Sequence, residues 1–220
     1  MRRGMPVLET GLWDDACGGE RRDAAESRRR VLDAATFLFE ERSVDAVNMY
    51  EIGREAGVGQ GTLYRRYEHK GALCAALLQE SFARFSEEVQ YHLEKDGGPA
   101  LAQIKYFLYR LAEFNEKNAP LLGAIRDAAG GGRRPEVYRN PFYRWLKETV
   151  AALLEKAVEE GEIPPLDMEY AADAILAPLN IDLYLFQRHE LGMDPERITT
   201  SLSRLVLNGL RGTREEHGKS

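Results

Sequence analysis

Apolar residues along this chain recur at intervals of three and four positions, which is the spacing of one face of an α-helix. Between Glu26 and Arg42 the apolar side chains share one face, and acids and arginines occupy the other. The same period returns after Lys70 and continues to about Gly212. No segment shows a convincing alternation of apolar and polar residues, so the pattern predicts an all-α protein.

Two short helical segments follow the first helix, with a glycine turn between them. Residues 48–57 predict the first of these segments, because Asn48 and Glu51 have the spacing of a capping box. Residues 60–67 predict the second, about two turns long. Its inward positions are Leu63 and Tyr67. Short helices joined by a turn that contains glycine are typical of a helix-turn-helix.

Helix-breaking residues divide the remainder of the chain. Glycines before Pro99 end a long helix that starts at Lys70. Pro120 is expected to open a shorter helix, and Pro178 to kink a later one. Residues 130–135 predict a loop. The expected helices after that loop run from about Asn140 to Glu160, from Asp167 to His189 and from Asp194 to near Gly212.

Composition and charge narrow the class of protein. The chain has 220 residues, of which 44% are apolar and 30% charged, as in a globular protein rather than a fibrous or disordered one. Its 30 basic and 36 acidic residues give a formal net charge of −6. No overall positive field draws in nucleic acid or an anionic membrane, so any binding to DNA must come from a local patch.

Hydropathy and cysteine usage indicate the compartment. No apolar run approaches the roughly 18 residues of a membrane span, and acidic residues interrupt every short apolar stretch within residues 1–25. Cys17 and Cys74 lie far apart and do not form the dense framework of a small secreted domain. We therefore expect a cytoplasmic protein with reduced thiols and no membrane partner. Residues 1–25 are expected to be a mobile tail.

Motifs for catalysis or metal binding are weak. The four histidines have no His-Glu-x-x-His spacing, and neither cysteine belongs to a Cys-x-x-Cys pair. The glycine-rich residues 130–134 follow no expected strand and precede no Gly-Lys-Ser or Gly-Lys-Thr, so they do not predict a phosphate-binding loop. No pair of carboxylates stands out as an acid–base couple. We expect no catalytic residue, no metal site and no cofactor.

The segment from Asn48 to Leu73, NMYEIGREAGVGQGTLYRRYEHKGAL, resembles the DNA-binding segment of TetR-type bacterial transcription regulators. It has the Ala-Gly-Val turn, the Gly-x-Leu-Tyr recognition helix and the following Lys-x-x-Leu of that family. With the first helix, the resemblance covers about a quarter of the chain. The remainder is similar to the family only in length and helix count.

Three positions depart from the family's pattern. Gly53 stands where the pattern usually has Ala, which lowers helix stability by up to about 1 kcal/mol but allows closer helix approach. Asn48 replaces a common Thr, so it keeps the capping role and alters a phosphate contact. His69 replaces a small capping residue, and we therefore expect the helix after it to begin less firmly.

The start of the second helix in a helix-turn-helix enters the major groove, where glycine and short polar residues fit. Gln60 has the amide for a bidentate pair with adenine, and Thr62 offers a hydroxyl to a base or a methyl to thymine. Tyr64 and Arg66 are better placed for phosphate, and Arg65 for a base or a phosphate according to helix tilt. The candidate DNA contacts are Asn48, Gln60, Gly61, Thr62, Tyr64, Arg65, Arg66 and Lys70.

Further cations flank this segment. Lys70 starts the next helix, where an ammonium and free backbone N–H groups together suit a phosphate. Residues 28–30 are arginines at the start of the first helix, where the helix dipole disfavours cations. They are either phosphate contacts or a solvated charge run. The structural alternative for the whole segment is that Tyr64 and Tyr67 are core rings and the arginines a solvated face, and core packing is favoured for Tyr67.

The resemblance divides the chain into a helix-turn-helix DNA-binding domain at residues 26–72 and a helical effector-binding and dimerisation domain at residues 73–212, followed by a tail at 213–220. Residues 168–186 are apolar over more than one face, and residues 198–210 carry a broad apolar stripe. The resemblance implies that these last two helices pair with those of a second copy in a homodimer. A monomer that buries both faces internally is the alternative.

Aromatic residues are frequent between Leu73 and Val158, and an apolar pocket with a few polar groups would suit a small organic effector. The candidate pocket residues are Phe82, Phe85, Tyr106, Phe107, Phe114, Phe142, Tyr143 and Trp145. Plain core packing is the alternative for each of them.

By resemblance, the expected function is that of a transcription repressor that leaves double-stranded operator DNA when its effector binds. The motif does not set the sign of regulation, so an activator stays open. A dimer that senses nothing is another alternative. So is a helical-bundle enzyme or small-molecule carrier in which the helix-turn-helix is vestigial.

Overall fold

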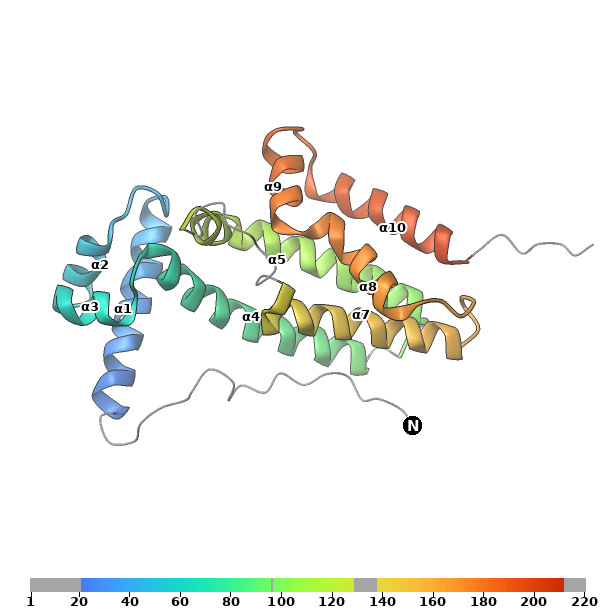
Figure 1. Cartoon of the computed structure of the whole chain (residues 1–220), viewed down its shortest axis with the longest axis horizontal. Coiled ribbons are helices and arrows are strands. Elements are labelled where there is room, and N and C mark those ends of the chain that lie inside the picture. Colours follow the sequence, from blue (N-terminus) through green and yellow to red (C-terminus); the bar gives the residue numbers. More distant parts are fainter. Residues whose placement is uncertain (1–20, 96, 129–137, 212–220) are drawn as a thin grey trace, which may run out of the picture. The chain divides into compact units, whose positions relative to one another are not determined.

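The computed structural model describes residues 21–95, 97–128 and 138–211, and every regular element within them is helical (Figure 1). The elements are α1 (Arg21–Glu41), α2 (Met49–Glu55), α3 (Gln60–Arg66), α4 (Lys70–Lys95), α5 (Ala100–Ala128), α7 (Pro141–Glu159), α8 (Met168–Leu176), the 3₁₀ turn η2 (Ala177–Leu179), α9 (Ile181–His189) and α10 (Pro195–Arg211). The all-α prediction is confirmed. None of the helices in these residues is long and apolar enough to cross a membrane.

Helix α1 begins earlier than the sequence predicted, because residues 21–25, expected to belong to the tail, are already helical. Two alanines favour the helix there, and Asp23 lies in the first turn, where a carboxylate is favourable. The arginines at residues 28–30 consequently lie inside α1 and not at its positive end. Cys17, the loop expected at 130–135 and the tail at 213–220 lie outside the described residues.

Side-chain caps open several helices. Asn48 Oδ1 accepts the Glu51 N–H at 3.0 Å and Glu51 Oε2 accepts the Asn48 N–H at 2.9 Å, so the predicted capping box is confirmed. The expectation of a weak start to α4 is wrong, because His69 Nδ1 accepts the Ala72 N–H at 3.1 Å and caps the helix. The N-caps of α7, α8 and α9 are Asn140, Asp167 and Asn180.

Pro120 lies inside α5 and does not open a new helix, so that prediction is wrong. Proline has no N–H, and the carbonyl of Glu116 therefore receives no helical hydrogen bond from residue 120. Both residues are exposed, where water can replace the missing bond. A boundary between two compact units of the chain falls directly after Glu116.

Pro178 divides the helix expected from Asp167 to His189 and does not merely kink it. Helix α8 ends at Leu176, the turn η2 follows, and α9 begins after a new N-cap. Asn115 Nδ2 donates to the carbonyl oxygen of Leu179 at 2.8 Å, which supplies a partner for a backbone group at this break. Leu179 is only 4% exposed, so the break is part of the core.

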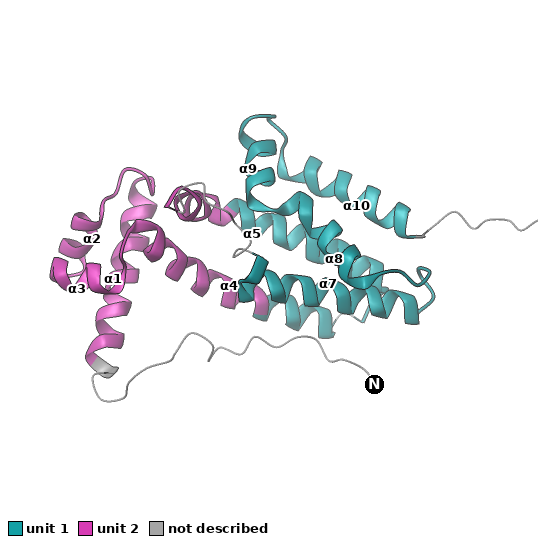
Figure 2. Cartoon of the chain, in the orientation of Figure 1, with its two compact units in different colours: residues 1–7, 87–116, 135–220 teal, residues 8–86, 117–134 magenta. Residues whose placement is uncertain are grey.

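The chain forms two compact units (Figure 2). Among the described residues, the HTH unit comprises 21–86 and 117–128, and the bundle unit comprises 87–95, 97–116 and 138–211. The HTH unit thus extends beyond the domain boundary expected at residue 72 and includes the end of α5. Helices α4 and α5 each belong to both units.

The core of the HTH unit is continuous over α1, α2, α3 and the start of α4. Its most buried side chains include Ala35, Ile52, Leu63 and Leu73. A second cluster contains Val44, Cys74 and Ala124. Burial raises the pKa of the Cys74 thiol to about 11, so Cys74 is a neutral core residue at physiological pH.

Polar bonds tie α9 to α5 within the bundle unit. The fully buried Tyr184 donates its hydroxyl to Glu116 Oε2 at 3.0 Å, and the Ala112 carbonyl oxygen lies 3.3 Å from the same hydroxyl. Arg188 donates from Nε and Nη2 to the two oxygens of Glu116 at 2.8 and 2.7 Å. This bidentate geometry sets the orientation of α9 more strictly than apolar contact alone.

Candidate nucleic-acid interface and ligand recess

The turn between α2 and α3 has the geometry that its glycine predicts. Gly57 adopts φ +63°, a left-handed conformation that other residues rarely take. The N–H of Val58 donates to the carbonyl oxygen of Gly53 at 2.9 Å and closes the end of α2. Ile52 at 0% and Leu63 at 1% exposure then pack α3 onto α2.

The outer face of α3 consists of exposed residues. They are Gly61, Thr62, Tyr64, Arg65 and Arg66. Tyr64 is 50% exposed, so the alternative that it is a core ring is wrong, whereas Tyr67 is 6% exposed and packs in the core as predicted. A face with two cations and a phenol on so short a helix can contact both phosphates and base edges.

Gln60 does not lie on this outer face. It is half-buried, and its Nε2 donates to the carbonyl oxygen of Tyr50 on α2 at 3.2 Å. The side chain expected to pair with adenine is directed instead at the neighbouring helix, because α2 has no side chain at Gly53 to block it. To reach a base, Gln60 would have to give up this bond.

Lys70 is also directed inward. Its Nζ donates to the carbonyl oxygens of Val44 at 2.9 Å, Val47 at 3.2 Å and Asp45 at 3.4 Å. An ammonium has three donors, and these three carbonyls account for all of them. The structure therefore gives Lys70 a role in holding the loop between α1 and α2, and not the phosphate contact that its position in the sequence predicted.

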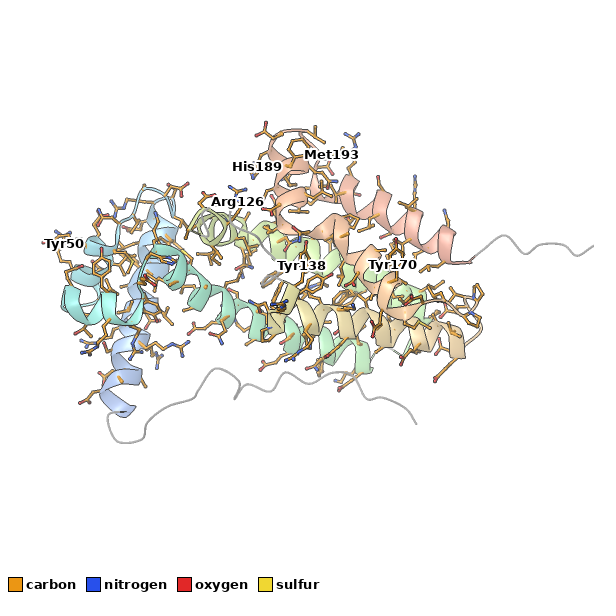
Figure 3. All side chains as sticks on the ribbon, viewed as in Figure 1. Tyr50, Arg126, Tyr138, Tyr170, His189 and Met193 are labelled. Atoms are coloured by element: carbon orange, nitrogen blue, oxygen red, sulfur yellow. The ribbon has the colours of Figure 1, made fainter. Side chains whose placement is uncertain are left out.

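Sequence reasoning missed Tyr50, which is 63% exposed on α2 (Figure 3). The helical period contained the signal, because Tyr50 follows the buried Met49 and therefore falls on the outer face. Arg54, one turn later, is exposed as well. The guanidinium of Arg30 lies near the turn, since Nη1 is 3.9 Å from a Cβ built at Gly57.

The positive charge on α2 and α3 is local, because the formal net charge of the whole chain is −6. Arg54, Arg65 and Arg66 are exposed, whereas Arg42 donates to Glu51 Oε1 at 3.0 Å. The hydrogen bond from the Asn48 backbone, followed by that from Arg42, holds the pKa of Glu51 below its usual value. The carboxylate of Glu51 therefore stays charged and keeps α2 capped.

Most aromatics predicted to line a pocket pack against one another. The ring centroids of Phe107 and Trp145 lie 6.1 Å apart, and those of Phe114 and Phe142 5.6 Å apart. The ring of Tyr106 stacks on that of His92 at 3.6 Å. Phe82 and Phe85, whose centroids are 6.1 Å apart, are buried in the HTH unit. Core packing accounts for these contacts.

A recess of about 390 Å³ lies in the bundle unit, beside the start of α7. Its lining residues are Tyr138, Tyr143, Lys147, Asp173, Leu176, Ala177 and Asn180. Tyr143 is the one predicted pocket residue among them. Tyr138, labelled in Figure 3, lies just before α7, and its ring meets that of Tyr143 edge to face at 5.0 Å between centroids.

A charged pair lies in the recess. Tyr143 donates its hydroxyl to Asp173 Oδ1 at 2.8 Å, and Lys147 donates Nζ to Asp173 Oδ2 at 2.8 Å. Burial and the bond to Asp173 raise the pKa of Tyr143, which remains a neutral phenol. Within the described residues no group of three or more histidines, cysteines or carboxylates is able to hold a metal ion.

Large apolar side chains are exposed on α8, α9 and α10 and on the α9–α10 connection. They are Tyr170, Leu183, Phe186, Leu191 and Leu205. Leu205 on α10 is 75% exposed and Tyr170, labelled in Figure 3, is 74% exposed. Exposed apolar side chains are typical of a protein–protein interface where they form a contiguous patch.

Known proteins match both the HTH segment and most of the chain. Residues 31–77 match the sequence profile of the bacterial regulatory proteins of the tetR family. The HTH-type transcriptional regulator SAB2452 of Staphylococcus aureus is 28% identical over 167 residues, which are 76% of this chain and 85% of that protein. The helix-turn-helix segment of this chain belongs to the TetR family of bacterial regulatory proteins. A second relative from the same species, SAUSA300_2515, is 27% identical to this regulator over the same shares of both chains.

Solved structures of TetR-type proteins share the fold. Thermus thermophilus FadR, a TetR-family transcriptional repressor in complex with lauroyl-CoA, is 21% identical to this regulator, with a TM-score of 0.67 over 88% of this chain and 99% of that one. Bacillus subtilis FadR in complex with stearoyl-CoA is 17% identical, with a TM-score of 0.62 over 82% and 98%. At these identities the likeness establishes the fold.

Proposed function

We propose that this regulator binds double-stranded operator DNA as a homodimer through α3, and that a small organic effector bound in the bundle unit releases it. The outer face of α3 carries the proposal, since Thr62, Arg65 and Arg66 are exposed on a helix that Leu63 anchors in the core. A short polar helix presented in this way fits the major groove.

Two kinds of DNA contact follow from the position of each residue. Gly61 and Thr62, at the start of α3, are placed for base edges. Tyr64, Arg65 and Arg66 are placed for bases or phosphates further along the groove. Asn48 and Tyr50 at the start of α2 are exposed and add contacts to the sugar–phosphate backbone. Thr62 and Arg65 are the expected sequence readers.

Homodimerisation uses the last two helices, α9 and α10. One α3 helix contacts too few base pairs for useful specificity, and a dimer places two of them on half-sites about 34 to 36 Å apart. The exposed Leu183 and Phe186 on α9 and Leu205 on α10 support this surface. The bidentate Arg188–Glu116 pair supports it as well, because it holds α9 in a defined orientation.

The effector is an organic molecule that combines an apolar part with a hydrogen-bonding group. Leu176 and Ala177 supply apolar lining to the recess, and Tyr138, Lys147 and Asn180 supply polar groups. Acyl-CoA thioesters are the first candidates to test, because two proteins of the same fold contain them. Effector binding and operator binding must weaken each other by the same factor.

Release of the operator depends on helices that belong to both units. Helix α4 begins at Lys70, directly after the recognition helix, and continues into the bundle unit. A rotation of α4 therefore changes the placement of α3 through a continuous backbone. We assign the regulator a repressor's role without catalytic activity. The alternative, a helical enzyme or carrier, requires only the recess and no working α3.

A gel shift with the DNA upstream of the regulator's own gene tests the proposal. The wild-type chain is expected to bind with strong salt dependence, and Arg66→Ala to lower the slope of log K against log salt by about one. Arg144→Ala, an exposed arginine of α7, is the control that leaves the slope unchanged. Lauroyl-CoA is expected to reduce operator binding, with free CoA as its control. Failure of the wild-type chain to bind any upstream duplex at low salt would refute the proposal.

Sedimentation equilibrium tests the dimer independently. Leu205→Glu is expected to shift the chain from dimer to monomer, because a charge would be placed in an apolar interface. Tyr91→Glu, at a 60% exposed aromatic on α4, is the matched control. A wild-type chain that is monomeric at micromolar concentration would contradict this part of the proposal.

A further inference from the structure

Gln60 and Gly53 fit together in the angle between α2 and α3. Gln60 Nε2 donates to the carbonyl oxygen of Tyr50 at 3.2 Å. A Cβ built at Gly53 would lie 2.4 Å from Gln60 Nε2 and 3.3 Å from its Cδ. The amide of Gln60 therefore occupies the space that an alanine methyl would take, and a methyl at position 53 would displace it.

Leu63 belongs to the same contact. Its Cδ2 lies 3.3 Å from a Cβ built at Gly53, and the side chain is 1% exposed. Gln60 and Leu63 are three residues apart, which places them on one face of α3. This face packs on α2, whereas the exposed residues Thr62, Arg65 and Arg66 form the outer face. The position of Gln60 is thus on the packing side of the recognition helix.

We propose that Gln60 is a positioning residue that holds the recognition helix at its angle on α2. Its amide packs against Gly53, and the outer face of α3 reads the DNA sequence. The inference rests on the DNA binding proposed above. It gives a reason for glycine at a position where the family's pattern usually has alanine. A Gln60 turned toward a base would lose its bond to Tyr50 and leave a gap beside Gly53.

The contact between Gly53 and Gln60 predicts that a double variant recovers DNA binding. This recovery distinguishes a positioning role of Gln60 from direct reading of a base. Gln60→Ala removes the bond and opens the gap, and Gly53→Ala expels the amide. The double variant Gly53→Ala/Gln60→Ala places a methyl in the gap and has no amide to clash with it. It is therefore expected to recover most of the binding that each single variant loses.

The experiment begins with selection of a binding site from a random duplex library by the wild-type full chain. Affinities of the wild type and the three variants are then measured for the selected duplex, for each of its single base-pair changes and for an unrelated duplex. Circular dichroism fixes a temperature at which every chain is folded. Thr62→Ala serves as the reference for lost base reading.

Gln60→Ala is expected to weaken binding to the selected duplex about two- to tenfold, the range for one lost hydrogen bond. Binding to the unrelated duplex is expected to change less than about twofold, because its phosphate contacts are intact. The preferred base at every position is expected to stay the same, unlike in Thr62→Ala. A purely structural role would lower the melting temperature without changing the ratio of selected to unrelated binding.

Two results would overturn the inference. In the first, Gln60→Ala relaxes the preference at a single base pair and the double variant recovers nothing, which makes Gln60 a base reader. In the second, Gln60→Ala binds like the wild type. If Gly53→Ala alone does not fold, Gln60→Ala and the double variant still distinguish a positioning role of Gln60 from base reading. A wild type that selects no common site would instead refute the proposed DNA binding itself.

Discussion

A Cβ built at Gly71 on α4 would lie 2.4 Å from the Cβ of Ala128 at the end of α5. The same atom would lie 3.2 Å from the carbonyl oxygen of Ala124. All three residues belong to the HTH unit. The start of α4 and the end of α5 therefore approach so closely that only glycine fits between them.

Gly71→Ala is expected to destabilise the regulator by about 1 to 3 kcal/mol, the usual range for overpacking. The gain in helix propensity is at most about 1 kcal/mol and does not compensate. The clash involves a methyl and a backbone oxygen, neither of which can rotate away, so the two helices must separate. Thermal unfolding followed by circular dichroism measures the change.

Two variants control this prediction. Gly123→Ala on α5 has open space around the new methyl and is expected to stabilise the chain by up to about 1 kcal/mol. Adding Ala128→Gly to Gly71→Ala is expected to restore part of the lost stability, because it removes the closest of the neighbouring groups. Equal melting temperatures for Gly71→Ala and Gly123→Ala would contradict the close approach.

Lys70→Met is expected to destabilise the HTH unit by about 1.5 to 3 kcal/mol, since hydrogen bonds to a charged group are lost and loop carbonyls are left without their donor. If the ammonium acts on the loop and not on phosphate, the variant keeps the salt dependence of DNA binding. Arg66→Met is the comparison and is expected to lower the salt slope by about one. A lowered salt slope of DNA binding in Lys70→Met, with an unchanged melting temperature, would indicate that Lys70 contacts phosphate.

Tyr67→Phe is expected to stabilise the chain by about 1 kcal/mol. Within the described residues the buried hydroxyl of Tyr67 has no hydrogen-bond partner, and removing an unsatisfied polar group recovers its desolvation penalty. The ring stays in the core, so packing is preserved. Tyr64→Phe, at an exposed ring, is the control and is expected to change stability by less than about 0.5 kcal/mol. A lower melting temperature for Tyr67→Phe would show that the hydroxyl has a partner in solution.

Acid is expected to weaken the bond between α5 and α9. Hydrogen bonds from Arg188 and then Tyr184, with the charge of His189 as a smaller contribution, hold the pKa of Glu116 below its usual value of 4.5. A depressed pKa in the folded state means that this stabilisation is complete above the unfolded value and is lost as pH falls through the folded one. The pair is partly exposed, so we expect a contribution of about 1 kcal/mol.

Urea unfolding of the wild type and Glu116→Gln at pH 7 and at pH 3 measures this contribution. The difference between the two chains is expected to be present at pH 7 and to be smaller at pH 3, because the stabilisation is lost as pH falls below 4.5 toward the lowered pKa of the folded state. Glu148→Gln, at an exposed carboxylate of α7, is the control. A difference that stays constant across this range would exclude Glu116 as its source.

Local chemistry made much of the fold predictable from the sequence. The capping box of Asn48 and Glu51 needs only residues three apart, and the inward faces with Leu63 and Tyr67 follow from helical spacing. The Ala-Gly-Val turn depends on one glycine at positive φ. Because these features are determined within one or two helical turns, the sequence identified the helix-turn-helix and the exposed side of its second helix.

Contacts between distant residues decided the rest. The inward bonds of Lys70 reach residues more than twenty positions earlier, and those of Gln60 reach the preceding helix. The proline signal for a helix start at Pro120 was likewise misleading, because α5 continues through that residue. The amino-acid sequence was enough to predict which face of α3 is exposed, because periodicity is a local property. Which polar side chains of α3 and its neighbours are exposed and which bond to another segment depended on the packing of the helices, because hydrogen-bond partners are chosen in three dimensions.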